Sequence, residues 1–383
     1  MRVLTVCVDT PGHVNPLLPL AAALARQGDD VVITAGPGAV ALAEAAGIPS
    51  QVVGHGFDGW FGQLVSRTRG TPGEGLPPER IQHYFQPRLF AEIGAADMID
   101  ALVAIPTPDL VVFEGYAYAA ALAAAIVDVP AVCLQVGFQP PNDVSESVAD
   151  SLAPLWRACG QPADRKRAVF GDVLLRTPPP SLEPAEAPVP AMSVRPTEPP
   201  ATAPRPEEPP LVHVTAGTAP HRDLEVVRRV LAALRDEPVQ VLATVGSDAS
   251  AERIGDVPAN ARVLGYASYP DLLPRCSAVV HHGGAGTMYA ALAHGLPAIV
   301  TPSGADQFAN AARLQAAGVA VVLDAASSPE AIRAAVHTAL QDEAMRGRPR
   351  QVAAEIAAMP DVATVAAALR TLAAQRRERA PAV

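Results

Sequence analysis

Residues 278–314 read AVVHHGGAGTMYAALAHGLPAIVTPSGADQFANAARL, and this stretch carries the clearest structural signal in the chain. Its first residues form a short apolar run typical of a buried parallel strand. A glycine-rich turn follows, and it opens directly into an apolar helix that stops at another glycine. A second apolar strand, PAIVTP, comes next. The pattern predicts a strand–turn–helix unit of a parallel α/β sheet.

The turn in this unit is suited to bind a phosphate. Bare amides from Gly283 to Thr287 can approach an anion closely, and the helix dipole adds favourable charge at the same end. A dinucleotide-binding fingerprint is a competing interpretation, because Gly284 and Gly286 have the G-x-G spacing and Asp306 lies about 20 residues downstream. Tyr289 replaces the third glycine of that fingerprint, and two histidines enter the turn, so we favour another kind of phosphate site. A glycine turn without a ligand is the remaining alternative.

Strand–helix repeats occupy both halves of the chain. The start, RVLTVCV, DTPGHVNP and LLPLAAALARQG, is again strand, loop and helix, and DVVITA, PDLVVFEG and PAVCLQV are further strands. Beyond a proline-rich stretch, LVHVTAG, VQVLATVG, ARVLGY and VAVVL continue the pattern. Because 383 residues exceed what one core organises, we expect two Rossmann-like domains. We place them at residues 1–200 and 211–358, with a proline-rich linker at 201–210 and a last helix at 359–383.

Composition narrows the possible partners and chemistry. A formal net charge of −10 gives no electrostatic footprint for nucleic acid or anionic membrane. No apolar run is long enough to cross a bilayer and the amino terminus is not signal-like, so we expect a cytoplasmic protein. Lys166 is the only lysine, which excludes a P-loop lysine, a Schiff-base lysine and a Tyr-x-x-x-Lys dehydrogenase pair. The four cysteines have no metal or disulfide spacing.

The motif HHGGAGT, followed by Asp306 and Gln307 in ADQ, resembles the donor-binding signature of family 1 glycosyltransferases. The similarity extends through LGYASYPDLLPRCSAVV and FANAARLQAAGVAVVL, and GHVNPLLPLAAALARQG is similar to the acceptor-side opening of that family. The chain most resembles bacterial enzymes that attach nucleotide-activated deoxysugars to polyketide, macrolide and enediyne natural products. The resemblance implies a GT-B fold, in which two Rossmann-like domains face each other across a cleft and the last helix returns to the first domain.

The resemblance also implies the donor-binding residues. His282 would hydrogen-bond the diphosphate, with the amides of Gly283, Gly284, Gly286 and Thr287 around it, and Asp306 and Gln307 would hold sugar hydroxyls. Gly217 and Thr218 in HVTAGT would close the phosphate site.

Two departures from plant members concern the nucleoside. Tyr266 stands where those enzymes place a tryptophan that stacks on the base, and tyrosine can stack as well. Ala290 stands where they place a glutamate that binds the ribose hydroxyls. A thymidine diphosphate (dTDP) donor, whose sugar lacks the 2′-hydroxyl, therefore fits better than a uridine diphosphate.

His13 is the predicted catalytic base. It lies in a Pro-Gly-His-Val-Asn-Pro loop at the carboxyl end of the first strand, where ligands bind in such sheets. A neutral imidazole can take the proton of an acceptor hydroxyl that attacks the anomeric carbon opposite the leaving diphosphate, which inverts the configuration. Glu114, at a strand end where relatives commonly place aspartate, is expected to fix its tautomer. The alternatives are a helix-capping histidine and a surface carboxylate.

Aromatic side chains are concentrated before the linker, which favours the first domain as the acceptor side. The predicted acceptor-binding residues lie between residues 54 and 90, where we expect irregular structure, and after the strand PAVCLQV; core packing is their alternative role. They are Trp60, Phe61, Tyr84, Phe85 and Phe138. No Asp-x-Asp and no zinc-ligand spacing occurs, so no metal is expected, and amides, helix dipole and His282 would stabilise the leaving group.

Together these features predict an inverting, metal-independent hexosyltransferase without a cofactor. It would move a deoxysugar from a dTDP- or UDP-sugar to a hydroxyl of a small apolar aglycone, and a homodimer is compatible with the sequence. Two alternatives remain: a nucleotide-sugar epimerase or hydrolase of the same fold, and a non-catalytic auxiliary protein that binds a nucleotide sugar.

Overall fold

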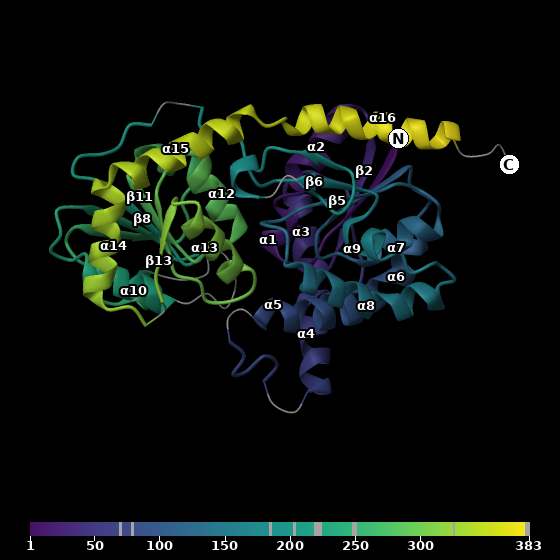
Figure 1. Ribbon diagram of the computed structural model, residues 1–383, viewed down its shortest axis with the longest axis horizontal. Helices are drawn as coiled ribbons and strands as arrows, with labels where there is room; N and C mark the ends of the chain where they lie inside the picture. Colours follow the sequence, from purple (N-terminus) through teal and green to yellow (C-terminus); the bar gives the residue numbers. More distant parts are fainter. Residues whose placement is uncertain are drawn as a thin grey trace. The chain divides into compact units, whose positions relative to one another are not determined.

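The computed structural model describes residues 1–68, 71–77, 80–183, 186–201, 204–217, 224–246, 251–324 and 326–379. The chain divides into two compact units, which are coloured along the sequence in Figure 1. Unit 1 comprises Met1–Thr177, Pro184–Val194 and Pro360–Val383, and unit 2 comprises Pro178–Glu183 and Arg195–Met359.

Unit 1 contains a parallel sheet in the strand order β3-β2-β1-β4-β5-β6-β7. Its strands are β1 (Arg2–Val6), β2 (Asp30–Ala35), β3 (Ser50–Val52), β4 (Leu110–Glu114), β5 (Ala131–Leu134), β6 (Val173–Arg176) and β7 (Ala191–Ser193). Its helices are α1 (Pro11–Val14), α2 (Leu18–Arg26), α3 (Pro37–Ala45), α4 (Gly56–Arg67), α5 (Ile81–Phe85), the π-helix η2 (Gln86–Gly94), α6 (Ala95–Val103), α7 (Ala119–Ile126), α8 (Asn142–Ala158), α9 (Arg165–Phe170) and α16 (Val362–Arg379).

Unit 2 contains a second parallel sheet, in the order β10-β9-β8-β11-β12-β13. Its strands are β8 (Leu211–Thr215), β9 (Gln240–Thr244), β10 (Ala261–Leu264), β11 (Ala278–His281), β12 (Ala298–Val300) and β13 (Ala320–Val322). Its helices are α10 (Leu224–Ala233), α11 (Tyr269–Leu272), α12 (Ala285–Ala293), α13 (Gln307–Ala316), α14 (Pro329–Gln341) and α15 (Glu343–Ala358), with short 3₁₀ turns η3 (Pro180–Leu182), η4 (Ala251–Ile254) and η5 (Leu273–Arg275). The expectation of two parallel α/β sheets is confirmed.

Burial on both faces explains why the central strands of the sheet in unit 1 are mostly apolar. In β1, Leu4 and Val6 pack into one core of unit 1, whereas Val3 packs into the core on the opposite face. Successive side chains of a strand point to opposite faces, so a parallel sheet covered on both sides needs a continuous apolar run. Packing on both faces of the sheet thereby fixes the positions of the carboxyl ends of β1 and β4 within unit 1.

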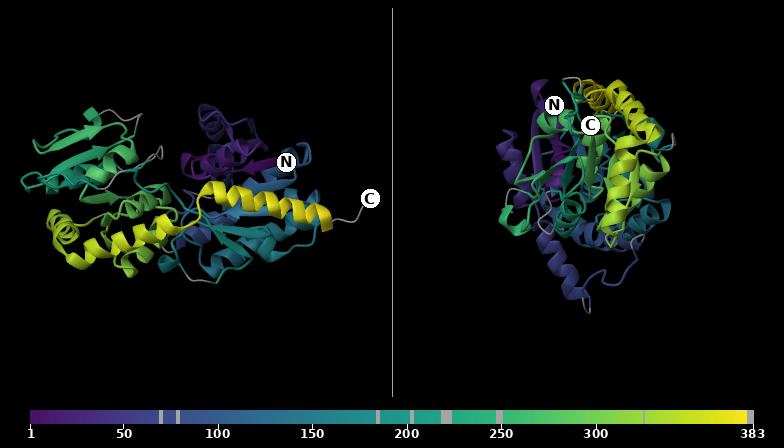
Figure 2. Two further views of the ribbon diagram at one scale, coloured as in Figure 1. Left: turned by 90° about the horizontal axis from the view of Figure 1, so that it is seen from above. Right: turned by 90° about the vertical axis from the view of Figure 1, so that its left-hand side faces the viewer.

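Helix α16 is part of unit 1 although it ends the described chain. Its buried residues Val365, Ala366 and Leu369 join the core cluster that contains Leu20 and Leu24 of α2. Figure 1 shows α16, in yellow, lying along α2, and Figure 2 shows the same yellow helix from two further directions. Polar contacts reinforce this packing, because Arg370 Nη1 donates to Gln27 O at 2.6 Å and Gln27 Nε2 donates to Ala363 O at 2.9 Å.

The unit boundaries differ from those expected at residues 200 and 211. Pro178–Glu183 and the chain from Arg195 onward belong to unit 2, whereas Pro184–Val194, which contains β7, belongs to unit 1. The reason is pairing: β7 pairs with β6 and forms the edge of the sheet in unit 1, while Ser181 N donates to Glu355 Oε2 at 3.0 Å and Arg195 Nη2 donates to Ala357 O at 2.9 Å. Proline content alone does not reveal these contacts.

No single helix in the described parts of the chain is long and apolar enough to cross a membrane, although α15 and α16 taken together reach the necessary length and composition.

Candidate active site

A histidine and a glutamate meet where two neighbouring strands of unit 1 end. His13 lies in α1, the single turn that follows β1, and Glu114 is the last residue of β4, which pairs with β1. His13 Nδ1 lies 2.8 Å from Glu114 Oε2 although 101 residues separate them in sequence. Parallel strands carry their following loops to the same edge, and this brings the two side chains together.

The Glu114 carboxylate is held by the backbone from both sides. Val8 N donates to Oε1 at 3.0 Å, and Tyr116 N donates to Oε2 at 3.1 Å. The Glu114 side chain is fully buried, whereas the His13 side chain is 20% exposed. The alternative of a surface carboxylate at Glu114 is therefore wrong. With Nδ1 donating to the carboxylate, the lone pair of the neutral imidazole resides on Nε2.

Aromatic rings extend away from His13 along the same side of unit 1. The His13 ring meets the Tyr116 ring edge-on, with centroids 5.0 Å apart, and lies 6.4 Å from the Phe90 ring. Phe57 lies 6.2 Å from Phe90 and 6.3 Å from Phe61, also between centroids. Tyr116, Phe90 and Phe57 were not predicted from the sequence. Tyr116 could have been found from its position two residues after Glu114.

Among the predicted acceptor residues, Trp60 is a core residue. It is 2% exposed, and its Nε1 donates to Asp97 Oδ2 at 2.7 Å, so its ring does not line an open site. The expectation of irregular structure around it is also wrong, because Trp60 and Phe61 lie in α4 and Tyr84 and Phe85 lie in α5. Asp97 accepts a further bond, from His55 N at 2.7 Å, and so fixes the start of α4 over a long sequence distance.

The other predicted aromatic residues fall into two places. Phe61 and Phe85 stack with centroids 6.4 Å apart, and Tyr84 contacts Phe85 edge-on at 5.1 Å. These three rings are partly exposed and continue the series that begins at Tyr116 and Phe90. Phe138 is 6% exposed and lies after β5, where it lines a separate small pocket with Tyr116. The structure therefore does not gather all five predicted residues around one cavity.

The glycine-rich turn of unit 2 has the expected strand–turn–helix form. β11 ends at His281, Gly283 has a φ of +91°, and Gly284 is the N-cap residue of α12. The His282 ring lies close to the backbone of two glycines: a Cβ at Gly217 would lie 2.5 Å from its Cε1, and a Cβ at Gly284 would overlap its Nε2. These two glycines are needed because of the imidazole beside them.

His282 is partly buried and neutral in this turn. Burial lowers its pKa to about 4, and its buried Nδ1 has no hydrogen-bond partner among the described residues. Beside it, a Cβ added at Gly286 would meet nothing within 4 Å. The first amides of α12 lack partners within the helix, as at every helix start. Thr287 Oγ1 contacts Tyr269 OH at 2.9 Å, which ties this helix to α11.

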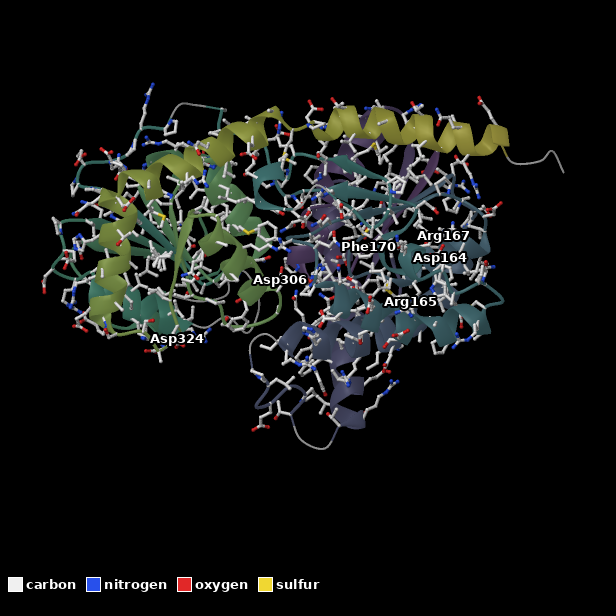
Figure 3. All side chains as sticks on the ribbon, viewed as in Figure 1. Asp164, Arg165, Arg167, Phe170, Asp306 and Asp324 are labelled. Atoms are coloured by element: carbon white, nitrogen blue, oxygen red, sulfur yellow. The ribbon has the colours of Figure 1, made fainter. Side chains whose placement is uncertain are left out.

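Asp306 is the N-cap residue of helix α13 and Gln307 is its first residue, and both lie close to the turn. Figure 3 labels Asp306 at this place, and its Oδ2 accepts from Asn310 Nδ2 at 3.0 Å. Asn310 Nδ2 also donates to Gly283 O at 2.9 Å, so one amide links the two segments. Gln307 Oε1 accepts from Ser303 N at 2.9 Å. Asn310 is a residue that sequence reasoning missed, although its position one helical turn after Asp306 was a signal.

The sequence also predicts Tyr266 and Thr218 as donor-binding residues. Tyr266 lies in the loop between β10 and α11 and is 72% exposed. Thr218 lies outside the described residues. Among the described residues, no group of three or more His, Cys, Asp or Glu side chains is arranged to hold a metal ion.

Known proteins share both the sequence and the fold of this chain. Residues 228–372 match the family model described as Erythromycin biosynthesis protein CIII-like, C-terminal domain. The chain is 33% identical over 395 residues to the L-demethylnoviosyl transferase of Streptomyces niveus, with all of both chains covered. It is 30% identical over 432 residues to the tylactone mycaminosyltransferase of Streptomyces fradiae, covering 98% of this chain and 93% of that protein.

A solved structure gives the same result at the level of the fold. The crystal structure of the glycosyltransferase VinC in complex with dTDP superposes with a TM-score of 0.78 at 27% identity, covering 98% of this chain and 100% of that one. The predicted GT-B architecture is thereby confirmed. The chain therefore belongs to the family of antibiotic-biosynthesis glycosyltransferases that includes these proteins, and it is a glycosyltransferase of the GT-B fold.

Proposed function

We propose that this glycosyltransferase moves a deoxysugar from a dTDP-sugar to a hydroxyl of a small apolar natural product, with inversion and without a metal ion. The names of the two relatives describe transfer of the sugars demethylnoviose and mycaminose, and the VinC structure holds dTDP. These names support a deoxysugar donor for this chain. Unit 1 would bind the acceptor and unit 2 would bind the donor.

The contact between His13 and Glu114 carries the proposal. A buried carboxylate that accepts from Nδ1 holds the imidazole in the tautomer whose Nε2 can take a proton, and it stabilises the imidazolium that forms. In this mechanism Nε2 removes the proton of the acceptor hydroxyl while the oxygen bonds to the anomeric carbon. The bond from that carbon to the diphosphate oxygen breaks at the same time. A single displacement of this kind inverts the anomeric configuration.

The turn before α12 supports the departure of the diphosphate. A neutral His282 can donate a hydrogen bond, and the first amides of α12, which lack partners within the helix, lie next to Gly286, where an added Cβ would meet nothing within 4 Å. Preorganised donors of this kind stabilise negative charge as it develops on a leaving group. Asp306 and Gln307, which begin α13, would contact the sugar hydroxyls, and Tyr266 would stack on the base.

The test compares His13→Ala and Glu114→Gln with His337→Ala, which removes another histidine that contacts a carboxylate, Glu237, at 3.0 Å. Donor binding is followed by the thermal shift with dTDP, and turnover by formation of the glycoside from a panel of dTDP-sugars and polyketide aglycones. We expect His13→Ala to lower kcat by about 10²- to 10⁴-fold with the dTDP shift retained, and His337→Ala to change neither.

Glu114→Gln should lower kcat as well, because the amide no longer stabilises the imidazolium. The anomeric configuration of the product, read by proton NMR against that of the donor, tests inversion. Unchanged turnover in His13→Ala would refute the assignment of the base. Donor consumption at the same rate without any aglycone would instead indicate a hydrolase.

A further inference from the structure

Gln86 is a buried amide at an unusual point of the backbone. It is the first residue of η2, a π-helix of nine residues that follows α5, and it is 2% exposed. π-Helical turns are rare and are frequently found at functional sites. The same helix carries Phe90, which lies beside the His13 ring. The π-helix therefore places Gln86 and Phe90 on the side of unit 1 that holds the proposed base.

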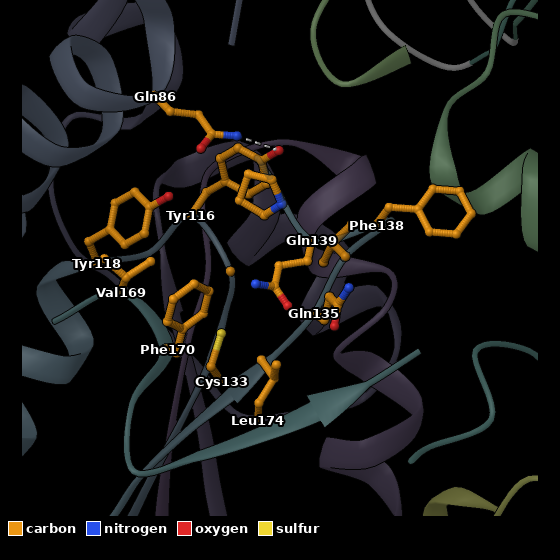
Figure 4. Close-up of a pocket in the computed structure, with 13 residues that line it drawn as sticks. Gln86, Tyr116, Tyr118, Cys133, Gln135, Phe138, Gln139, Val169, Phe170 and Leu174 are labelled. Atoms are coloured by element: carbon orange, nitrogen blue, oxygen red, sulfur yellow. Dashed lines mark hydrogen bonds between the residues drawn. The ribbon is translucent and has the colours of Figure 1, made fainter. Parts of the chain in front are cut away.

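Of the two polar atoms of the Gln86 carboxamide, only the nitrogen has a hydrogen-bond partner among the described residues. Nε2 donates to the hydroxyl oxygen of Tyr116 at 3.1 Å, whereas the buried Oε1 accepts no hydrogen bond from any described residue. Buried carbonyl oxygens in native proteins are nearly always paired, because an unpaired one keeps its full desolvation penalty. Figure 4 shows the amide nitrogen turned to Tyr116 and the oxygen turned away from it. The oxygen requires a hydrogen-bond donor.

This carboxamide lines a small pocket in unit 1 (Figure 4). The buried side chains of Tyr118, Cys133 and Leu174 contribute apolar walls, and the partly exposed Tyr116 and Gln139 show that the pocket reaches the surface of the unit. Its volume is about 30 Å³, room for about two water-sized groups. A hydroxyl or hydroxymethyl substituent fits such a space, but an aromatic ring does not.

We propose that this pocket is a specificity subsite for a second hydroxyl on the acceptor, whose O–H donates to Gln86 Oε1. The inference rests on the proposed function in one respect, that unit 1 binds the acceptor. Tyr116 connects the two places: its ring contacts His13, its amide holds Glu114, and its hydroxyl holds Gln86. An acceptor seated over Tyr116 would present one hydroxyl to His13 and another to Gln86. The favoured acceptors are therefore polyhydroxylated.

The experiment measures binding of 2,7-dihydroxynaphthalene and 2-naphthol, which differ by one hydroxyl on the second ring, to the full chain without a donor. Calorimetry gives the ratio of the two Kd values for the wild type, Gln86→Met and Gln86→Glu. We expect the wild type to favour the diol about tenfold, the gain from one buried hydrogen bond. Gln86→Met, of similar size but without an acceptor oxygen, should bring the ratio near one, and Gln86→Glu should keep the preference.

An equal affinity of the wild type for the two naphthols, or a preference for the diol that persists in Gln86→Met, would overturn the proposal. The wild-type ratio tests it even where Gln86→Met does not fold. Because no sugar is transferred, the result is independent of turnover. His13→Ala should keep the preference for the diol while losing glycoside formation, so the failure of the proposed function and the failure of this subsite are distinguishable.

Discussion

Glycine is required at positions 217 and 284, because the imidazole ring of His282 lies against the backbone of both residues. Gly217 also has a φ of +81°, a conformation that other residues adopt only with strain. Gly217→Ala and Gly284→Ala should therefore displace His282, lower the melting temperature of unit 2 and weaken dTDP binding by at least tenfold. Calorimetric unfolding and titration with dTDP measure both effects.

Gly286→Ala should change dTDP binding without disturbing the fold, because an added Cβ at this position would meet nothing within 4 Å. The unliganded melting temperature should stay unchanged or rise slightly, since alanine is a better helix residue than glycine by about 1 kcal/mol. Affinity for dTDP should nevertheless fall if the diphosphate occupies the space beside this residue. Gly347→Ala, also in open space within a helix of unit 2, is the matched control and should leave dTDP binding intact. Undiminished affinity in Gly286→Ala would place the diphosphate elsewhere.

At the level of the element, strands β8 and β11 bring buried histidines into the centre of the sheet of unit 2. Burial lowers the pKa of His213 to about 4, and burial together with His282 and His213 lowers that of His281 to about 3. With His282, three imidazoles are neutral in the folded unit, whereas they titrate near 6.5 when unfolded. Between about pH 6.5 and 4 the unfolded chain binds more protons than the folded one.

The free energy of unfolding of unit 2 should therefore be highest above pH 6.5. It should decrease as the pH falls through this window, by up to about 1.4 kcal/mol per pH unit for each histidine. Far-UV circular dichroism melts from pH 7.5 to 4.5 measure it. His213→Gln should reduce the slope, because one of the three protons is no longer taken up. A melting temperature of unit 2 that is constant across this range would contradict the lowered pKa values.

Elements differed in how far the sequence predicted them. Residues 278–314 were predicted well because their fold is local: an apolar run, a glycine with positive φ and a helix start follow one another along the chain. Residues 54–90 were not, because α4 depends on Asp97, which receives His55 N and Trp60 Nε1 from far along the chain. The π-helix η2, which begins at Gln86 and contains Pro87, likewise has no simple periodicity to detect.

The candidate site likewise contains residues that could be predicted from the sequence and others that depend on contacts between distant elements. His13 and Glu114 could be predicted because His13 follows one parallel strand and Glu114 ends another, and the order of these strands makes their ends neighbours. Asn310 joins Asp306 to Gly283 through side-chain geometry, and Tyr116 joins His13 to Gln86 in the same way. Such links depend on rotamers and on contacts between distant elements, which a single sequence does not encode in any readable spacing.

For the molecule as a whole, the important feature is that unit 1 is discontinuous: its core includes α16 from the end of the chain. Both tryptophans, Trp60 and Trp156, lie in unit 1, so tryptophan fluorescence reports the unfolding of that unit alone. Leu369 of α16 is fully buried against residues of α2. Leu369→Ala should destabilise unit 1 by about 2–5 kcal/mol, the usual cost of such a cavity.

The fluorescence transition should then move to lower urea concentration in Leu369→Ala, while the exposed Thr371→Ala on the same helix leaves it within about 0.5 kcal/mol of the wild type. Because dTDP is proposed to bind unit 2, saturating dTDP should stabilise that unit through mass action and should not restore the fluorescence midpoint of Leu369→Ala. The two perturbations would thus separate the units, each with its own core. A fluorescence midpoint that Leu369→Ala leaves unmoved would show that α16 contributes no stability to unit 1, and full rescue by dTDP would show that the two units unfold as one.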